Sequence, residues 1–355
     1  MRISLRLTLC FLVLLILAGC GNSGSSGSSS FAGGGSNPAG SSNPNPSSSP
    51  TGTNTTTSTA TIITNGAIRK FILPSLPAGP FGVCLGPDGR VWFTRQNAGL
   101  VSALDTSGNL QDFSGFGSQP SGICSGPDGN LWIVTGTTIA RLTPSGSLTH
   151  FPKAGIASFG KICPGPDGNL WYTDPLSLRV SRITPAGVIT DFPVPNSGTG
   201  QGPLGICVGP DNNLWFTCGN PRLGRLTTAG TFTMFDYPLA AGGEGGSICQ
   251  GRDGNLWFTH TSGRIFRATT GGAVTAFTSG ISSGAFPVGI CSGLDGNLYF
   301  TEIQGRGVGR ITTAGVITEL GDTTTGANCL DICVGSDSNL WFSDFLGNAL
   351  GVLTP

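Results

Sequence analysis

One phrase recurs seven times along this chain and limits its fold more than any other feature. It reads Gly-Ile-Cys, a glycine, Pro-Asp-Gly-Asn and then Leu-Trp-Phe-Thr, with small variations. Its cysteine recurs at steps of 40, 39, 44, 42, 42 and 42 residues. The seven cysteines are Cys84, Cys124, Cys163, Cys207, Cys249, Cys291 and Cys333. A fixed period of this size is typical of repeat architectures, in which each unit stacks against its neighbours.

Each repeat predicts four short strands joined by tight turns. Pro-Asp-Gly-Asn predicts a hairpin, because proline presets φ and glycine accepts the left-handed conformation that closes the turn. Leu-Trp-Phe-Thr is apolar on both alternating faces, so this second strand must be covered from both sides. Third and fourth strands follow, as in residues 181–184 and 187–192. Four strands repeated seven times over residues 62–355 predict an all-β fold, a seven-bladed β-propeller of four-stranded blades.

The two ends of the repeat region predict how the ring closes. The last repeat stops after its third strand, at residues 351–354. Residues 66–71, which precede the first repeat, match the missing fourth strand. We therefore expect the N-terminal strand to complete the last blade, which leaves no open sheet edge at the seam.

The N-terminus resembles a bacterial lipoprotein signal. Arg2 and Arg6 precede a short apolar stretch from Leu7 to Ala18, too short to span a bilayer permanently. The following Leu-Ala-Gly-Cys resembles a lipobox, which implies cleavage after residue 19 and lipidation of Cys20. The alternative is an ordinary signal peptide followed by a chance cysteine. With residues 1–19 as signal peptide, we expect export and lipid anchoring to the bacterial cell membrane or outer membrane.

Residues 20–61 predict a flexible linker between this anchor and the propeller. The segment is rich in Ser, Gly, Pro and Thr and carries no charged residue. It cannot bury enough apolar surface to offset its ordering entropy. As a random coil it would reach roughly 35 Å.

Composition narrows the classes of partner. The chain has 18 Lys and Arg against 18 Asp and Glu, and only 10% of its residues are charged. A nucleic-acid partner is therefore not expected, because no basic surplus is present. With 59 Gly and 24 Pro, a helical bundle is excluded as well. We expect a monomer.

The periodic cysteines are expected to be unpaired. Equivalent positions on neighbouring blades lie about 10 Å apart, whereas a disulfide needs Cα atoms within about 7 Å. They should act as small buried apolar side chains. Cys218 and Cys329 fall in different blades, so a bond between them is not expected either, and their role is left open.

The wording of the repeat resembles the virginiamycin B lyase (streptogramin lyase) family. The matching phrases are Pro-x-Gly-Ile, Gly-Pro-Asp-Gly-Asn-Leu-Trp-Phe-Thr, Gly-Arg-Ile-Thr and Gly-x-Ile-Thr-x-Phe, and they cover residues 62–355. The resemblance implies a seven-bladed propeller that opens the ester ring of streptogramin B antibiotics by elimination with Mg²⁺. It also implies a histidine base in a Pro-His-Gly-Ile segment of the last blade, two glutamate metal ligands and a second histidine that contacts substrate.

These implied residues are not matched in this chain. The base position is Leu330, the metal-ligand positions are Asn328 and Phe345, and the substrate-contact position is Val288. Leucine cannot take a proton, and phenylalanine cannot bind Mg²⁺, which requires oxygen ligands. Around the seven blades the base position reads Phe81, Ser121, Gly160, Leu204, Gly246, Val288 and Leu330, with no titratable group. We therefore expect no catalytic residue, metal site or cofactor of the family type, with Mg²⁺ only if the chain is a diverged enzyme.

A second set of polar residues ends the second strands. It consists of Arg95, Asp174, His260, Glu302 and Asp344. These residues are interpreted either as solvated loop ends or as a mixed polar ring at the channel mouth that binds a ligand or cation. His150 is expected to be a solvated residue of an outer strand. The third-strand arginines are expected on exposed blade surfaces, with a sugar- or anion-binding face as the alternative, and they are Arg141, Arg182, Arg225, Arg267 and Arg310.

Two functions remain open from the sequence. The first is a binding or interaction module, in which a tethered envelope lipoprotein presents a rigid propeller to a small molecule, glycan or envelope protein. The second is an enzyme, either a diverged lyase or a lactone hydrolase that acts at the channel mouth. The missing family residues favour the first.

Overall fold

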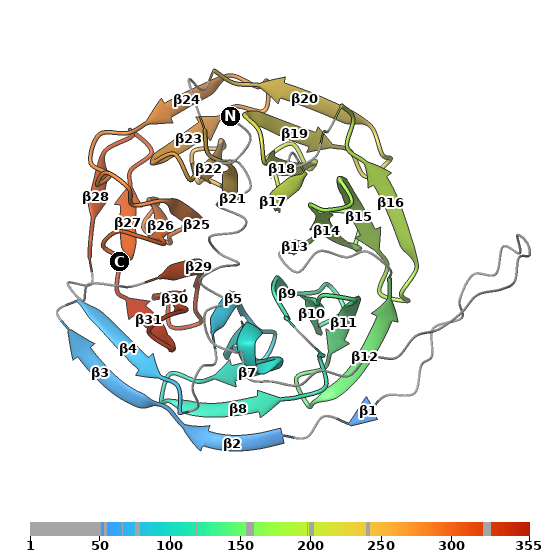
Figure 1. Ribbon diagram of the computed structural model, residues 1–355, viewed down its shortest axis with the longest axis vertical. Coiled ribbons are helices and arrows are strands. Elements are labelled where there is room, and N and C mark those ends of the chain that lie inside the picture. The colour runs from blue at the N-terminus through green and yellow to red at the C-terminus, as the bar shows by residue number, and fades with distance from the viewer. Residues whose placement is uncertain are drawn as a thin grey trace, which may run out of the picture. The chain divides into compact units, whose positions relative to one another are not determined.

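The computed structural model describes residues 51–355, except 53–54, 66, 75–78, 118, 154–159, 197, 199–201, 239–241 and 322–327. They belong to one compact unit, Ser48–Pro355. Seven antiparallel sheets form a closed ring, with the first strand of each sheet innermost (Figure 1). The predicted all-β, seven-bladed propeller is confirmed. The predicted signal peptide and Cys20 lie outside the described residues, and within the described part no helix could cross a membrane.

Each of the first four blades is built from consecutive strands. Blade 1 consists of β5 (Pro80–Leu85), β6 (Val91–Arg95), β7 (Leu100–Leu104) and β8 (Asn109–Phe113), with the 3-10 turn η1 (Gln96–Ala98) after β6. Blade 2 consists of β9 (Ile123–Ser125), β10 (Leu131–Val134), β11 (Thr138–Leu142) and β12 (Ser147–Pro152). Blade 3 consists of β13 (Ile162–Pro164), β14 (Leu170–Asp174), β15 (Arg179–Ile183) and β16 (Ile189–Pro193). Blade 4 consists of β17 (Pro203–Val208), β18 (Leu214–Cys218), β19 (Arg222–Leu226) and β20 (Phe232–Asp236).

The last three blades follow the same order, except that the final strand of blade 7 comes from the N-terminal side. Blade 5 consists of β21 (Gly245–Gln250), β22 (Leu256–His260), β23 (Arg264–Ala268) and β24 (Val274–Phe277). Blade 6 consists of β25 (Pro287–Ser292), β26 (Leu298–Glu302), β27 (Val308–Ile311) and β28 (Ile317–Glu319). Blade 7 consists of β29 (Cys329–Val334), β30 (Leu340–Asp344), β31 (Ala349–Leu353) and β4 (Ile68–Ile72). Because β4 pairs with β31, with Phe71 opposite Leu350, the predicted closure is confirmed.

Three blades carry a fifth strand that the sequence did not predict. The strands β3 (Thr61–Asn65), β2 (Thr55–Thr59) and β1 (Thr51–Gly52) pair with the outermost strands of blades 7, 1 and 2. Figure 1 shows them along the outside of the ring. The expectation of four strands in every blade is therefore corrected for these three. The end of the expected flexible linker, residues 20–61, is also corrected, since the part that the structure describes forms β1, β2 and the start of β3. Threonine favours extended backbone, and pairing with the neighbouring strands supplies the backbone hydrogen bonds.

The core lies between neighbouring blades. Every residue of β6 is buried, which explains why the second strand is apolar on both faces. Its Trp92 stacks on Phe113 of the outer strand, with ring centroids 5.0 Å apart. The indole Nε1 of Trp92 donates to Asp88 of the hairpin turn at 2.9 Å. The repeated aspartates are thus turn residues, as predicted.

Buried hydroxyl groups join each blade to the next. In blade 4, Thr217 Oγ1 accepts a hydrogen bond from Gly205 N at 2.9 Å and donates to Gly246 O of blade 5 at 2.6 Å. The same donation to the following blade is made by Thr94, Thr173, Thr259 and Ser343. The last residue of the Leu-Trp-Phe-Thr phrase therefore holds the ring together and is not only a strand former.

The cysteines are free thiols, as the spacing argument predicted. All nine cysteines in the described part are unbonded. Burial raises the pKa of Cys163 and Cys249 to about 12, so both remain protonated at neutral pH. Burial does the same for Cys218.

Candidate functional site

One face of the ring carries the starts of the first strands and the ends of the second strands. The antiparallel register sets this arrangement, since Pro80 pairs with Arg95 and Pro287 pairs with Glu302. We call this side the entry face. The chain positions that the family resemblance singles out therefore lie on this face.

Apolar residues lie at the entry-face ends of the first strands and in loops after the second strands, and we call this set the apolar rim. Phe81, Leu204, Val288 and Leu330 are half-buried and follow the start of their first strands. Leu176 and Leu346, in loops after second strands, are 79% and 54% exposed. A face with this much accessible apolar surface is suited to bind an apolar or aromatic group.

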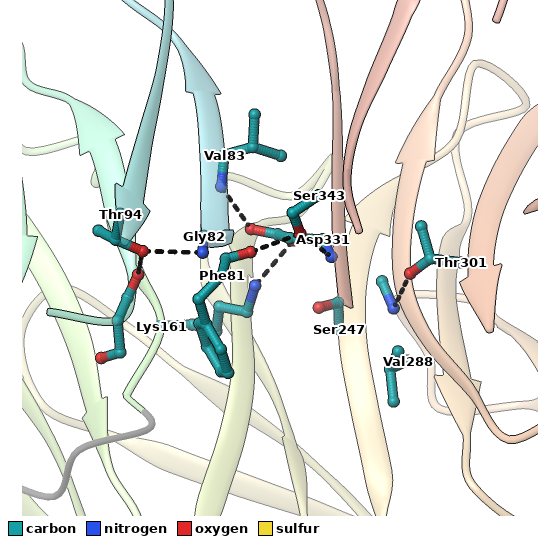
Figure 2. A network of polar contacts seen from close by, with 12 residues as sticks. Phe81, Gly82, Val83, Thr94, Lys161, Ser247, Val288, Thr301, Asp331 and Ser343 are labelled. Atoms are coloured by element: carbon teal, nitrogen blue, oxygen red, sulfur yellow. Dashed lines mark hydrogen bonds and ion pairs between the residues drawn. The ribbon is translucent and has the colours of Figure 1, made fainter. Parts of the chain in front are cut away.

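An ion pair crosses the channel behind this rim. Lys161, which immediately precedes β13 of blade 3, places its Nζ 2.7 Å from Oδ1 of Asp331 in β29 of blade 7. Blades 3 and 7 are separated by two blades on one side and three on the other, so the pair spans the ring. Figure 2 shows the two side chains meeting. Lys161 and Asp331 side chains are 24% and 15% exposed, so solvent or a ligand can reach them.

Asp331 also links the seam between blades 7 and 1. Its Oδ2 accepts a hydrogen bond from Val83 N at 3.1 Å. Its own backbone N donates to Ser343 Oγ at 3.1 Å, and Ser343 Oγ donates to Phe81 O at 2.7 Å (Figure 2). The carboxylate is therefore held in one orientation by groups from blades 1 and 3.

The sequence contained a signal for this pair that our sequence analysis missed. We looked for titratable groups at the base position of each repeat, but the two charged residues stand one position later. At the next position four blades have glycine, because a Cβ there would come within 2.3 Å of Ser121 O at Gly82 and 2.6 Å of Thr301 Oγ1 at Gly289. The other two glycines are Gly122 and Gly205. A lysine and an aspartate that depart from this glycine pattern mark the charged groups of the channel.

The five polar residues that end the second strands are buried within their own blades. Arg95, Asp174, His260, Glu302 and Asp344 are 0–1% exposed. Their interpretation as solvated loop ends is therefore wrong. Arg95 Nη1 lies 2.8 Å from Asp112 and Asp344 lies 2.9 Å from Lys70 Nζ, both partners being on the outer strand of the same blade. Arg95 and Asp344 are thus each paired within their own blade, as is Asp174, whose Oδ2 lies 3.1 Å from Arg179 Nε.

Two of these residues have unusual protonation. Nδ1 of His260 accepts a hydrogen bond from Ser262 N at 3.2 Å and lies 2.8 Å from Ser262 Oγ. Burial, followed by the charge of Arg264, lowers the pKa of His260 to about 4, so the ring is neutral. Burial, followed by the charge of Glu319, raises the pKa of Glu302 to about 7. Glu302 Oε2 accepts from Arg306 N at 2.9 Å.

The residues at the positions where the family resemblance implies metal ligands do not fit Mg²⁺. Asn328 is 6% exposed and its backbone N donates to Asp344 Oδ1 at 3.3 Å. Phe345 is 8% exposed, and its ring lies 2.7 Å from where a Cβ on Gly79 would stand. A phenyl ring supplies no oxygen, and the neighbouring Asp344 is already paired with Lys70. Across the part of the chain that the structure describes, no three His, Cys, Asp or Glu side chains are grouped to hold a metal ion.

Two other predictions about polar residues are corrected. The third-strand arginines are half-buried rather than exposed. Arg141, Arg182, Arg225 and Arg267 lie over the tryptophan of their own blade, and the first two and Arg267 also donate to a backbone oxygen of the next blade. Arg267 lies 5.8 Å from the Trp257 ring centroid and its Nη1 donates to Thr313 O at 3.2 Å. His150 is half-buried, with Nδ1 3.0 Å from Thr138 Oγ1 and Nε2 3.0 Å from Gly115 O of blade 1. Both residue types join strands and blades.

Comparison with known proteins gives consistent matches. The profile of the Virginiamycin B lyase family matches residues 51–152 and 114–355. A solved streptogramin B lyase is 31% identical, with a TM-score of 0.73 over 81% of this chain and 97% of its own. A catalytically inactive virginiamycin B lyase from Staphylococcus aureus, solved with quinupristin, is 30% identical, with a TM-score of 0.75 over 81% of this chain and 99% of its own. Kuenenia stuttgartiensis hydrazine synthase, 14% identical with a TM-score of 0.66 over 80% of this chain and 97% of its own, shares the fold alone. No curated protein sequence matches the chain.

Proposed function

Because the chain belongs to the virginiamycin B lyase family, we propose that its propeller is a binding module that takes a small molecule at the entry face without opening it. The observation that carries the proposal is an accessible apolar rim together with a leucine at the position that the family resemblance assigns to the general base. Phe81, Val288 and Leu330 are half-buried at the channel mouth, where they can contact a ligand. Leu330 stands where the family resemblance places a general base, and a leucine side chain cannot accept a proton.

The ligand class follows from the relative solved with quinupristin. We propose that this chain binds streptogramin-like cyclic peptides or molecules of similar shape and leaves their ester bond intact. An apolar rim around one polar pair is the composition expected of a site for such a molecule, because most of the affinity comes from apolar contact and orientation comes from a few polar groups.

We also propose that the protein acts outside the cytoplasmic membrane. Residues 1–19 would direct export, and a lipid on Cys20 would hold the propeller at a cell membrane or outer membrane. A binding protein at that location would meet its ligand before the ligand reaches the cytoplasm. The propeller is expected to act as a monomer, with no nucleic acid as partner. A glycan or an envelope protein remains a further kind of partner for the same face.

A calorimetric titration of the purified full chain with quinupristin tests the proposal. We expect saturable binding, together with no loss of intact quinupristin over hours with or without Mg²⁺, followed by mass spectrometry. Leu330→Asp places a charge in the apolar rim and should abolish binding, whereas Asp236→Asn, at an 86% exposed carboxylate on an outer strand, should leave it unchanged. Absence of binding by the wild-type chain would overturn the proposal for this ligand class, and Mg²⁺-dependent ring opening would replace it with lyase activity.

A second candidate function is a diverged lyase or lactone hydrolase, and one observation favours it. Ser262 Oγ lies 2.8 Å from Nδ1 of a neutral His260, and Arg264 Nη1 donates to the same oxygen at 2.8 Å. A hydroxyl beside an unprotonated imidazole is the arrangement that activates a serine for attack on an ester. Hydrolysis of simple lactones that is lost in both Ser262→Ala and His260→Gln would support this alternative, and no turnover would exclude it.

A further inference from the structure

We propose that the Lys161–Asp331 pair is the polar anchor of the entry-face site and selects an uncharged amide group of the ligand. The proposal rests on the binding function above and names the residues that give it specificity. In this arrangement, Lys161 Nζ donates to a ligand carbonyl, and a ligand N–H donates to Asp331. Phe81 belongs to the same polar network, because its backbone O accepts from Ser343 Oγ, which in turn accepts from Asp331 N (Figure 2).

Lys161 and Asp331 both keep unused hydrogen-bonding capacity. An ammonium group has three donors, and Lys161 Nζ has one contact, at 2.7 Å to Asp331 Oδ1, among the interactions that the structure describes. A carboxylate has about four acceptor positions, and Asp331 uses one on each oxygen, for Lys161 and for Val83 N. Both partners therefore keep unused capacity of opposite kind, a donor and an acceptor side by side. An amide offers the complementary acceptor and donor.

The charges of Lys161 and Asp331 favour an uncharged ligand group. The pair is neutral as a whole, and its side chains are only 24% and 15% exposed, in a channel whose rim is apolar. A ligand with one charge would leave that charge uncompensated at a partly desolvated site, which is unfavourable. An uncharged ligand group adds hydrogen bonds to charged partners without this cost. Hydrogen bonds of that kind are stronger than those between neutral groups.

The Lys161–Asp331 pair is held in a fixed position. Asp331 is oriented by the backbone N of Val83 and by the bond from its own N to Ser343 Oγ. Lys161 N donates to Thr173 Oγ1 at 2.9 Å, which fixes the lysine backbone on the opposite side of the channel. The two charged groups are therefore placed before any ligand arrives, so little side-chain entropy is lost on binding. A side chain at this position of the repeat would clash at Gly82 and Gly289, so these blades do not offer an equivalent anchor.

The test is a ligand series with one body and four charge states. N-acetyl-phenylalanine methylamide is neutral, N-acetyl-phenylalanine is anionic, phenylalanine methylamide is cationic, and free phenylalanine is zwitterionic. Their affinities for the purified full chain are measured by ligand-observed NMR, alongside the quinupristin titration. We expect the neutral member to bind at least tenfold more tightly than each singly charged member, and also more tightly than the zwitterion.

Variants then separate the role of the pair from the apolar rim. Lys161→Met and Asp331→Leu should each weaken the neutral member about tenfold, whereas the double variant Lys161→Gln with Asp331→Asn, which retains donors and an acceptor, should lose less than threefold. Asp236→Asn is the matched control for removal of an ion-paired carboxylate away from the channel, and thermal unfolding identifies any variant that does not fold. Tightest binding of a charged or zwitterionic member, or equal binding of all four, overturns the anchor. Quinupristin binding that persists in all pair variants also overturns the anchor but leaves the proposed function intact. If the wild-type chain binds none of the ligands, the proposed function itself is overturned.

Discussion

Removal of one blade-joining hydroxyl is expected to destabilise the whole ring. Thr217 is fully buried, and its Oγ1 accepts from Gly205 N at 2.9 Å and donates to Gly246 O at 2.6 Å. Thr217→Val keeps the shape of the side chain but leaves a buried N–H and a buried C=O without this partner. Each such group costs roughly 1–3 kcal/mol. The two groups together cost roughly 2–6 kcal/mol, and the methyl that replaces the hydroxyl returns less than about 1 kcal/mol, so we expect a loss of roughly 1–6 kcal/mol of unfolding free energy.

Urea unfolding followed by tryptophan fluorescence measures this loss. Thr217→Ser is the matched control, because it keeps the hydroxyl and removes only a methyl, and it should lose about 1 kcal/mol. Blade 2 provides a natural comparison, since Val134 occupies the threonine position and Ser121 Oγ donates to Gly160 O of the next blade at 3.5 Å instead. Val134→Thr should therefore bring no gain in stability. A Thr217→Val variant as stable as Thr217→Ser would refute the role assigned to the hydroxyl.

Three further predictions concern protonation, the arginines and the lipid. The pKa of Glu302 is about 7 in the folded protein, against 4.5 in the unfolded chain. The unfolding free energy should therefore fall by up to roughly 3 kcal/mol as the pH rises from 4.5 to 7. Glu302→Gln should flatten that dependence in urea unfolding at pH 5 and pH 8, and an unchanged slope would contradict the shift. Arg267→Met removes the contact with Trp257 and the bond to Thr313 O, and should lower the unfolding free energy by about 1–3 kcal/mol. The 66% exposed Arg306 serves as its control, since Arg306→Met should change stability by much less in thermal unfolding. Cys20→Ser should abolish incorporation of a labelled fatty acid, and a variant that still incorporates label would exclude Cys20 as the lipidated residue.

The fold could be read from the sequence because its determinants are local and repeated. The Pro-Asp-Gly-Asn turn fixes a hairpin within a few residues. The strand that contains Trp92 could be predicted to be buried on both faces, because apolar residues lie on both. The match between residues 66–71 and the missing fourth strand predicted the pairing of β4 with β31. The strands β2 and β3 were not predicted, because exposed threonine-rich edge strands have no apolar alternation to mark them.

The candidate site was harder to predict, because burial and partner choice depend on distant segments. Asp344 at a strand end looked solvated, yet Lys70 from the N-terminal strand meets it at 2.9 Å. His150 looked like an outer-strand surface residue, yet the neighbouring blade supplies Gly115 O. In both residues the decisive partner lies on another segment, which no local pattern reports.

The sequence by itself determined the number of blades, the strand order and the closure at the seam, and it has Leu330 where the family resemblance implies a general base. Each of these follows from a period or from the residue at one position. Only the tertiary structure decided that Lys161 and Asp331, separated by 170 positions in the sequence, meet at 2.7 Å. Closure of the ring brings the first strands of blades 3 and 7 to opposite sides of one narrow channel, and a long lysine side chain spans the space that remains. Repetition encodes what every blade does, whereas the contact across the channel exists only when all seven blades are in place.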